Sequence, residues 1–135
     1  MSMRFLGIDF GSKRVGIAIS DETGEFALPH AVFENNKDLL SLLEKLCKEK
    51  EIGVIIMGES RNFKGKDNLI MKKARDFTER LKKATDLPTY FEPELFTSAE
   101  ASRIQGETEM IDASAAALIL KSYLNKNKNG IDRGF

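Results

Sequence analysis

The order of strand-like and helix-like segments constrains this sequence more than any other feature. Three strand-like segments come first, at Arg4–Phe10, Val15–Ser20 and Phe26–Phe33, and turn-prone residues around Gly11 and Gly24 separate them. Helix-like and strand-like segments then alternate along the rest of the chain. A three-stranded meander followed by such alternation predicts an α/β fold, with a mixed sheet covered by helices on both faces.

The later elements follow from the spacing of apolar residues. Apolar residues recur with a helical period in the first and second predicted helices, whereas short continuous apolar runs indicate buried parallel strands. The predicted segments are a helix over Lys37–Lys50, a strand over Val54–Met57, a polar loop over Asn62–Asp67, a helix carrying Ile70, Ala74, Phe77 and Leu81, a strand over Pro88–Glu92, a short helix opened by the capping box Thr97–Glu100, and a last helix over Asp112–Leu124. The sheet should therefore have five strands.

Length and composition indicate one ordinary globular domain. The chain has 135 residues, of which 41% are hydrophobic and 31% are charged. We expect a single domain over residues 1–125 and a polar, frayed tail over residues 126–135. The sequence has no apolar run long enough for a membrane span or a signal peptide, and its one cysteine fits a reducing compartment. These features predict a cytoplasmic protein with no membrane partner.

Charge is balanced over the chain but is unevenly distributed. Residues 61–83 contain nine basic and three acidic residues, whereas residues 92–112 contain six acidic residues and one basic residue. A basic stretch attracts phosphates, and an acidic stretch can hold cations. The alternative is a solvated helix face followed by an acidic surface.

The scarcity of histidine and cysteine disfavours several kinds of catalysis. His30 is the only histidine and has no acidic or nucleophilic neighbour in the sequence. Cys47 lies on the apolar stripe of the first predicted helix, which is typical of core packing. Histidine-dependent triads and thiolate chemistry are therefore poorly supplied, and carboxylates are the candidates that remain.

Three carboxylates stand where the predicted elements begin or end. Asp9 lies near the end of the first strand, on the same face as Gly7, so a ligand has room beside it. Asp112 begins the last helix, and Glu94 follows the fifth strand. Each has a plainer interpretation, because Asp9 can cap the following turn, Asp112 can cap its helix and Glu94 can be solvated.

Their joint arrangement carries more information than any one of them. The carboxyl ends of the first and later strands can converge at one edge of the sheet, and the start of a packed helix can reach the same edge. Oxygen ligands gathered there suit Mg²⁺ or Mn²⁺. Two such ions can activate a water and stabilise the leaving oxygen in phosphodiester cleavage.

The sequence resembles the YqgF family, also called RuvX, of the RNase H-like superfamily. The resemblance extends from Arg4 to about Leu124 and comprises four motifs in the family's order. These are Gly7–Ala18, Gly58 with the polar loop through Asn62 and Gly65, Glu94 ahead of Thr97 and Ser98, and Ile111 and Asp112 followed by Ala115, Ala116, Ile119 and Leu120. The order of the motifs is more specific than any single motif.

The resemblance implies an RNase H-like fold and a nuclease that uses Mg²⁺ or Mn²⁺. It implies that Asp9, Glu94 and Asp112 bind the metal and are catalytic. The family is described as nucleases of pre-16S rRNA, acting in ribosome biogenesis, and earlier as Holliday junction resolvases. Structured RNA is therefore the first expected partner, and branched DNA, cut in recombination and repair, is the alternative.

Two further groups of residues are candidates for the same site. Gly58, Glu59 and Ser60 stand where the family usually has Gly-Leu-Pro, so we hypothesise that Glu59 supplements or replaces Glu94. Five basic residues in the loops expected near the metal are candidates for phosphate contacts, although they can equally be surface charge. They are Lys13, Arg14, Arg61, Lys64 and Lys66.

Two functions from other classes remain open. A catalytically silent RNA-binding factor would bind nucleic acid without cutting it. A nucleotide-binding module of the actin and sugar-kinase type also uses an Asp-x-Gly turn between two strands, but it needs a second lobe that one short domain does not provide. We expect a monomer or a weak homodimer, and junction cleavage would require two active sites related by symmetry.

Overall fold

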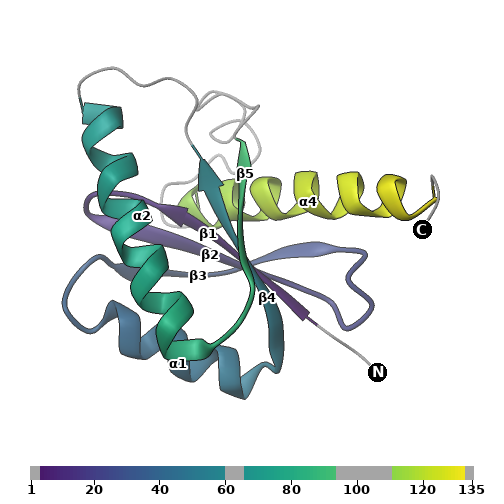
Figure 1. Cartoon of the computed structure of the whole chain (residues 1–135), viewed down its shortest axis with the longest axis horizontal. Coiled ribbons are helices and arrows are strands. Elements are labelled where there is room, and N and C mark those ends of the chain that lie inside the picture. Colours follow the sequence, from purple (N-terminus) through teal and green to yellow (C-terminus); the bar gives the residue numbers. More distant parts are fainter. Residues whose placement is uncertain (1–3, 60–65, 94–110, 133–135) are drawn as a thin grey trace.

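The computed structural model describes residues 4–59, 66–93 and 111–132, and only the backbone of residues 66–68, 111–112 and 127–132. Five strands form one sheet in the order β3-β2-β1-β4-β5 (Figure 1). The strands are β1 (Arg4–Phe10), β2 (Arg14–Ser20), β3 (Ala27–Glu34), β4 (Ile52–Glu59) and β5 (Thr89–Pro93). The helices are α1 (Leu39–Glu49), α2 (Lys66–Thr85) and α4 (Ile111–Asp132). The predicted five-stranded α/β fold is confirmed.

The sheet is mixed, as the sequence predicts. β1, β2 and β3 form an antiparallel meander, in which Asp9 pairs with Gly16 and Ile17 pairs with Ala31. β4 lies parallel to β1 on one side and to β5 on the other. Since β4 is covered on both faces and paired on both edges, its residues read as a continuous apolar run rather than an alternating one.

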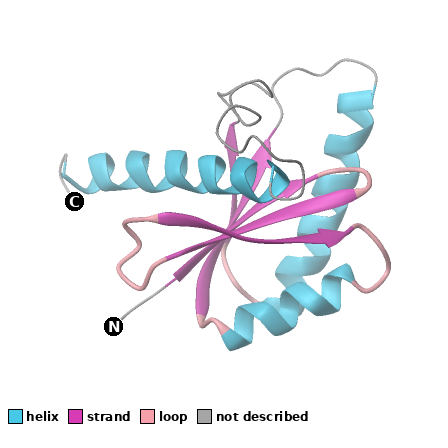
Figure 2. Cartoon of the chain, turned by 180° about the vertical axis from the view of Figure 1, so that it is seen from behind, coloured by secondary structure: helices cyan, strands magenta, loops and turns pink. Residues whose placement is uncertain are grey.

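Helices cover both faces of the sheet. Figure 2 shows α4 crossing in front of the sheet, with α1 and α2 on the far side. The side chains divide accordingly into two cores. Leu6, Ile8 and Met57 belong to the core beneath α1 and α2, whereas Ile56 and Ala18 pack against α4. Alternate residues along each strand therefore face different helices.

α4 approaches the sheet closely at Gly7. A Cβ atom added there would lie 2.9 Å from the Leu120 Cβ and 3.0 Å from the Ala116 carbonyl oxygen. Both distances are shorter than an ordinary van der Waals contact. The missing side chain thus lets the helix lie directly on β1. The room for a ligand that we expected at Gly7, beside Asp9, is therefore filled by α4.

The structure corrects the boundaries of several predicted elements. α4 continues to Asp132, beyond the predicted end at Leu124, so the helix includes polar residues that we expected in the tail. β4 runs over Ile52–Glu59 rather than Val54–Met57, because its backbone pairs with β1 before the apolar run and with β5 after it. The capping box at Thr97–Glu100 lies outside the described residues.

None of the helices in the described parts of the chain is long and apolar enough to span a lipid bilayer.

A single carboxylate organises the turn between β2 and β3. Asp21 accepts hydrogen bonds from the Thr23 hydroxyl at 2.6 Å and from the backbone N–H groups of Glu25 and Phe26 at 2.9 and 3.0 Å. These bonds, above all that from Thr23, lower the pKa of Asp21 from 3.8 to about 2, although the residue lies at the surface. The charged form of Asp21 therefore stabilises the turn.

We predict that Gly7→Ala destabilises the fold without abolishing it. The new methyl group must push against Leu120 and the Ala116 carbonyl, and such overpacking typically costs about 1–3 kcal/mol. Urea denaturation followed by circular dichroism would measure the change. An unchanged free energy of unfolding would mean that α4 does not lie this close to β1.

We also predict that Asp21→Asn reduces the loss of stability in acid. The pKa of Asp21 is lower in the folded protein than in the unfolded chain, so its stabilising effect is complete above about pH 4 and is lost as the pH falls towards 2. The wild type should therefore lose more stability than the variant between pH 5 and pH 2, by urea denaturation. Parallel pH profiles for the two proteins would contradict this account of the turn.

Candidate active site

Asp9 lies near the carboxyl end of β1 and is half-buried. Strand alternation places it with Phe5 and Gly7 on the face that α4 covers. Phe5 packs against Tyr123 of α4 with 6.0 Å between ring centroids, and Gly7 lies beneath Leu120 and Ala116. The face of β1 that carries Asp9 is thus directly beneath the helix.

These contacts set the direction in which α4 passes over β1. From Phe5 to Gly7, the contacting position on α4 moves back from Tyr123 to the turn between Leu120 and Ala116. One further step along this face of β1 reaches Asp9, and one further turn back along α4 reaches the beginning of the helix. Asp112 is the second residue of α4, so the backbone packing brings Asp9 and Asp112 to the same end of the site.

Glu59 lies on the other face of the sheet. It is the last residue of β4 and is half-buried, and it alternates in phase with Ile55 and Met57, which belong to the core beneath α1 and α2. The structure therefore brings Glu59 to the expected edge of the sheet but not to the face of Asp9. A metal ligand role for Glu59 stays a prediction.

The remaining predicted acid, Glu94, lies outside the described residues, and its metal-binding role also stays a prediction. Among the described residues, no three His, Cys, Asp or Glu side chains gather closely enough to hold a metal ion. Of the three predicted metal ligands, Asp9 has a side chain that the structure describes, and this side chain lies on the face that α4 covers.

The turn after Asp9 is fastened to the connection between β3 and α1. The Gly11 N–H donates to the Arg14 carbonyl at 3.1 Å, and a Cβ atom at Gly11 would lie 2.5 Å from that oxygen, so a larger residue does not fit. Asn35 secures the turn twice, because its Nδ2 donates to the Gly11 carbonyl at 2.7 Å and its backbone N–H donates to the Lys13 carbonyl at 2.9 Å. These contacts hold the turn in place beside Asp9.

The predicted phosphate-contacting residues are only partly in the expected loops. Lys13 lies in the turn and is exposed, whereas Arg14 is the first residue of β2 and Lys66 is the first residue of α2. The polar loop ends earlier than predicted because helical backbone already begins at Lys66. Arg61 and Lys64 lie outside the described residues.

Sequence reasoning missed the role of Glu92. This β5 residue is 3% exposed, and its Oε2 accepts a hydrogen bond from the Ser122 hydroxyl at 2.7 Å and lies 2.7 Å from the Lys126 Nζ. Both partners are on α4, so this buried carboxylate ties β5 to the helix. The sequence offered one signal for this contact, namely a charged residue within the predicted fifth strand.

Cys47 and His30, which we did not expect to be catalytic, are poorly suited to catalysis in the structure. Cys47 is buried in the core beneath α1, and burial, with a smaller effect of the Glu44 charge, raises the pKa of its thiol to about 11. His30 lies on β3, where partial desolvation and the charge of Lys50 lower its pKa. Neither residue shares the α4 face with Asp9.

Comparison of folds defines the class of protein. The chain is similar in structure to Thermus thermophilus RuvC, solved with a Holliday junction substrate, with a TM-score of 0.64 over 94% of this chain and 96% of that one at 14% identity. Fowlpox virus resolvase, solved with Holliday junction DNA, gives a TM-score of 0.59 over 93% and 99% of the two chains at 15% identity. The protein therefore has the RNase H-like fold of these resolvases.

Sequence comparison then gives the family. The RuvX family, described as Holliday junction resolvase, matches residues 3–126. A "Putative pre-16S rRNA nuclease" of Koribacter versatilis is 36% identical over 96% of this chain and 90% of its own length. A protein of the same name from Thermoanaerobacter pseudethanolicus is also 36% identical, over 94% and 99% of the two lengths. The chain belongs to the RuvX family.

Proposed function

We propose that this protein is a nuclease that depends on divalent metal and hydrolyses phosphodiester bonds in precursor 16S rRNA, in the cytoplasm. The observation that carries the proposal is family membership over nearly the whole chain, because relatives of similar length that are named as nucleases of this RNA are 36% identical to it. The position of Asp9 beneath the first part of α4 supports the same chemistry.

The side chains on this face suit a hard cation. Asp9 supplies carboxylate oxygens on the face of β1 that α4 covers. The soft ligand Cys47 is buried elsewhere, and His30 is on a different strand, so oxygen ligands prevail. Mg²⁺ and Mn²⁺ prefer such ligands. We propose that Asp9, Asp112 and Glu94 hold the metal.

When bound, divalent cations activate the attacking water and neutralise charge on the leaving oxygen in this type of reaction. The residues of this chain hold the proposed metal ligands in position. β1 fixes the Asp9 backbone through its pairing with β2 and β4, and α4 brings Asp112 to the same end of the site. Lys13, in the turn that Asn35 secures, and Arg14, at the start of β2, would contact the substrate phosphates.

Holliday junction cleavage is the second candidate. The description of the matching family favours it, as does the similarity in fold to two resolvases solved with junctions. Those resolvases are at most 15% identical to this chain, so the likeness concerns the fold alone. Junction cleavage would also require a homodimer with two symmetric sites, whereas a single cut in RNA needs only a monomer or a weak dimer.

The decisive experiment compares cleavage of a pre-16S rRNA fragment and of a four-way DNA junction in Mg²⁺ or Mn²⁺. We predict that the wild type cuts the RNA, that chelation stops the reaction, and that Asp9→Asn or Asp112→Asn slows it by more than about 100-fold, because metal-based stabilisation of several kcal/mol is lost. Cleavage of the junction alone would replace the RNA substrate with branched DNA. Binding without cleavage of either substrate would contradict the nuclease.

Matched variants make this test specific. Asp86→Asn makes the same chemical change at an exposed residue between α2 and β5. This residue precedes the beginning of β5, whereas Asp9 lies near the end of the parallel strand β1. Asp86 has φ of 58°, which asparagine also adopts, so the variant should fold and keep full activity. Glu94→Gln and Glu59→Gln then rank the remaining acids, and unchanged activity of Glu59→Gln would remove Glu59 from the site.

A further inference from the structure

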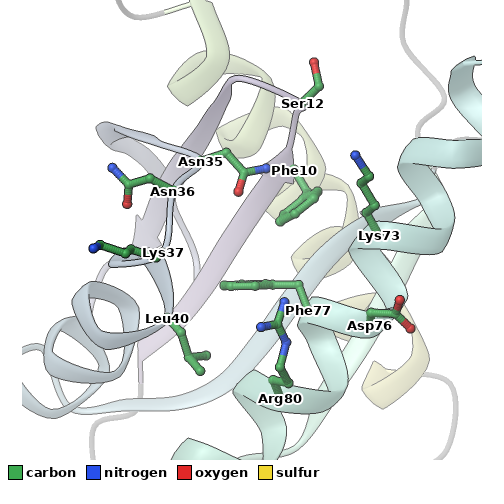
Figure 3. Close-up of a pocket in the computed structure, with 10 residues that line it drawn as sticks. All are labelled: Phe10, Ser12, Asn35, Asn36, Lys37, Leu40, Lys73, Asp76, Phe77 and Arg80. Carbon is green, nitrogen blue, oxygen red and sulfur yellow. The ribbon is translucent and has the colours of Figure 1, made fainter.

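A pocket of about 310 Å³ lies on the opposite face of the sheet from Asp9 (Figure 3). It is lined by residues from the β1–β2 turn, from the connection between β3 and α1, and from α2. Its volume is at the lower end of the range for sites that bind small organic molecules. The nuclease chemistry proposed above uses none of the side chains that line the pocket.

The apolar wall of the pocket consists of two phenylalanines. Phe10 comes from β1 and Phe77 from α2, and their ring centroids are 5.3 Å apart at an interplanar angle of 36°. Phe77 is buried in the core, whereas Phe10 is only half-buried and presents part of its ring to the pocket. The Arg80 guanidinium lies 5.9 Å from the centroid of Phe77. A flat ring could therefore stack on Phe10 beside a planar cation.

The polar rim of the pocket favours an anion. Lys37, Lys73 and Arg80 contribute three positive charges and Asp76 one negative charge, which leaves a formal balance of plus two. In Figure 3 the carboxylate of Asp76 points away from the two phenylalanine rings. An aromatic surface beside Lys73 and Arg80 matches the chemistry of a nucleotide, which has a flat base and a phosphate.

The location of the pocket links it to the proposed active site. Phe10 directly follows Asp9 in β1, and alternation sends the two side chains to opposite faces of the sheet. Ser12 also lines the pocket and belongs to the turn that Asn35 holds in place. A strand of nucleic acid passing around this turn would reach both faces within a few nucleotides.

We propose that this pocket binds an unpaired nucleotide of the substrate, next to the cleavage site. The base stacks on Phe10, and the phosphate contacts Lys73 and Arg80. The inference builds on the proposed nuclease and specifies its substrate: the enzyme selects RNA with a single-stranded segment beside the bond that it cuts. A base inside a duplex is stacked on its neighbours and cannot enter the pocket.

The test is the binding of a fluorescent single-stranded RNA 12-mer, and of the same RNA in a duplex, without divalent metal and with Asp9→Asn as the parent protein. We expect Lys73→Ala to weaken single-strand binding by about fivefold or more and to lower the salt slope by about 0.7. Phe10→Leu keeps an apolar side chain against Phe77 and should weaken single-strand binding about tenfold, with little effect on the duplex.

Lys72→Ala is the matched control. Lys72 precedes Lys73 on α2, carries the same charge and is exposed, but it does not line the pocket. We expect it to change binding by less than about twofold, since a single surface charge away from the ligand is screened. Equal effects of the two lysine variants would reduce the pocket to general surface charge and overturn the proposal. Circular dichroism and thermal unfolding would verify that each variant is folded.

A competition experiment with a mononucleotide distinguishes a nucleotide of the RNA strand from a free nucleotide as the ligand of the pocket. Uridine monophosphate should compete only weakly, because one nucleotide lacks the contacts of the rest of the strand. Tight competition by the mononucleotide, with single-strand binding unaffected by Phe10→Leu, would assign the pocket to a free nucleotide and overturn the proposal. Because these assays need no cleavage, they can fail while the nuclease activity of the wild type stands, and the reverse also holds.

Discussion

The contact between α4 and β1 at Gly7 determines how the rest of this molecule is arranged. A residue without a side chain lets the helix lie within contact distance of the strand, where the Ala116 carbonyl and Leu120 would meet any added Cβ atom. This approach brings the beginning of α4 to the end of β1. Asp9 and Asp112, which are far apart in the chain, can then serve one site. Two elements that pack at a single fixed point thus organise the candidate active site.

The proposed cleavage site and the proposed nucleotide pocket lie on opposite faces of the sheet. The α4 face carries Asp9 and is suited to cleavage, while the face beneath α1 and α2 carries the pocket beside Phe10. The β1–β2 turn joins the faces, and Asn35 anchors it to the connection between β3 and α1. A substrate that passes around this turn would be cut on one side and read on the other. The same strand therefore positions both functions.

The sequence predicted the elements and the sheet because their signals are local and periodic. It ended α4 too early because the residues after Leu124 are polar, yet one of them, Lys126, reaches the buried carboxylate of Glu92. That partnership joins a strand to a helix distant in the chain and leaves no periodic signal. The pocket was missed for the same reason, since three separate segments build it. Alternation gave the face that Asp9 shares with Gly7, but the face of Glu59 became clear only when the structure assigned Ile55 and Met57 to the core beneath α1 and α2.

The central claim is that Asp9 and Asp112 bind the same divalent metal. Titration of Mn²⁺, with free ion followed by electron paramagnetic resonance, tests it directly in the wild type, in Asp9→Asn, in Asp112→Asn and in the double variant. The account predicts that each single variant weakens binding by about tenfold or more, and that the double variant is little worse than either, because the first change already destroys the shared site. Unchanged binding in the single variants, or independent and additive losses, would contradict it.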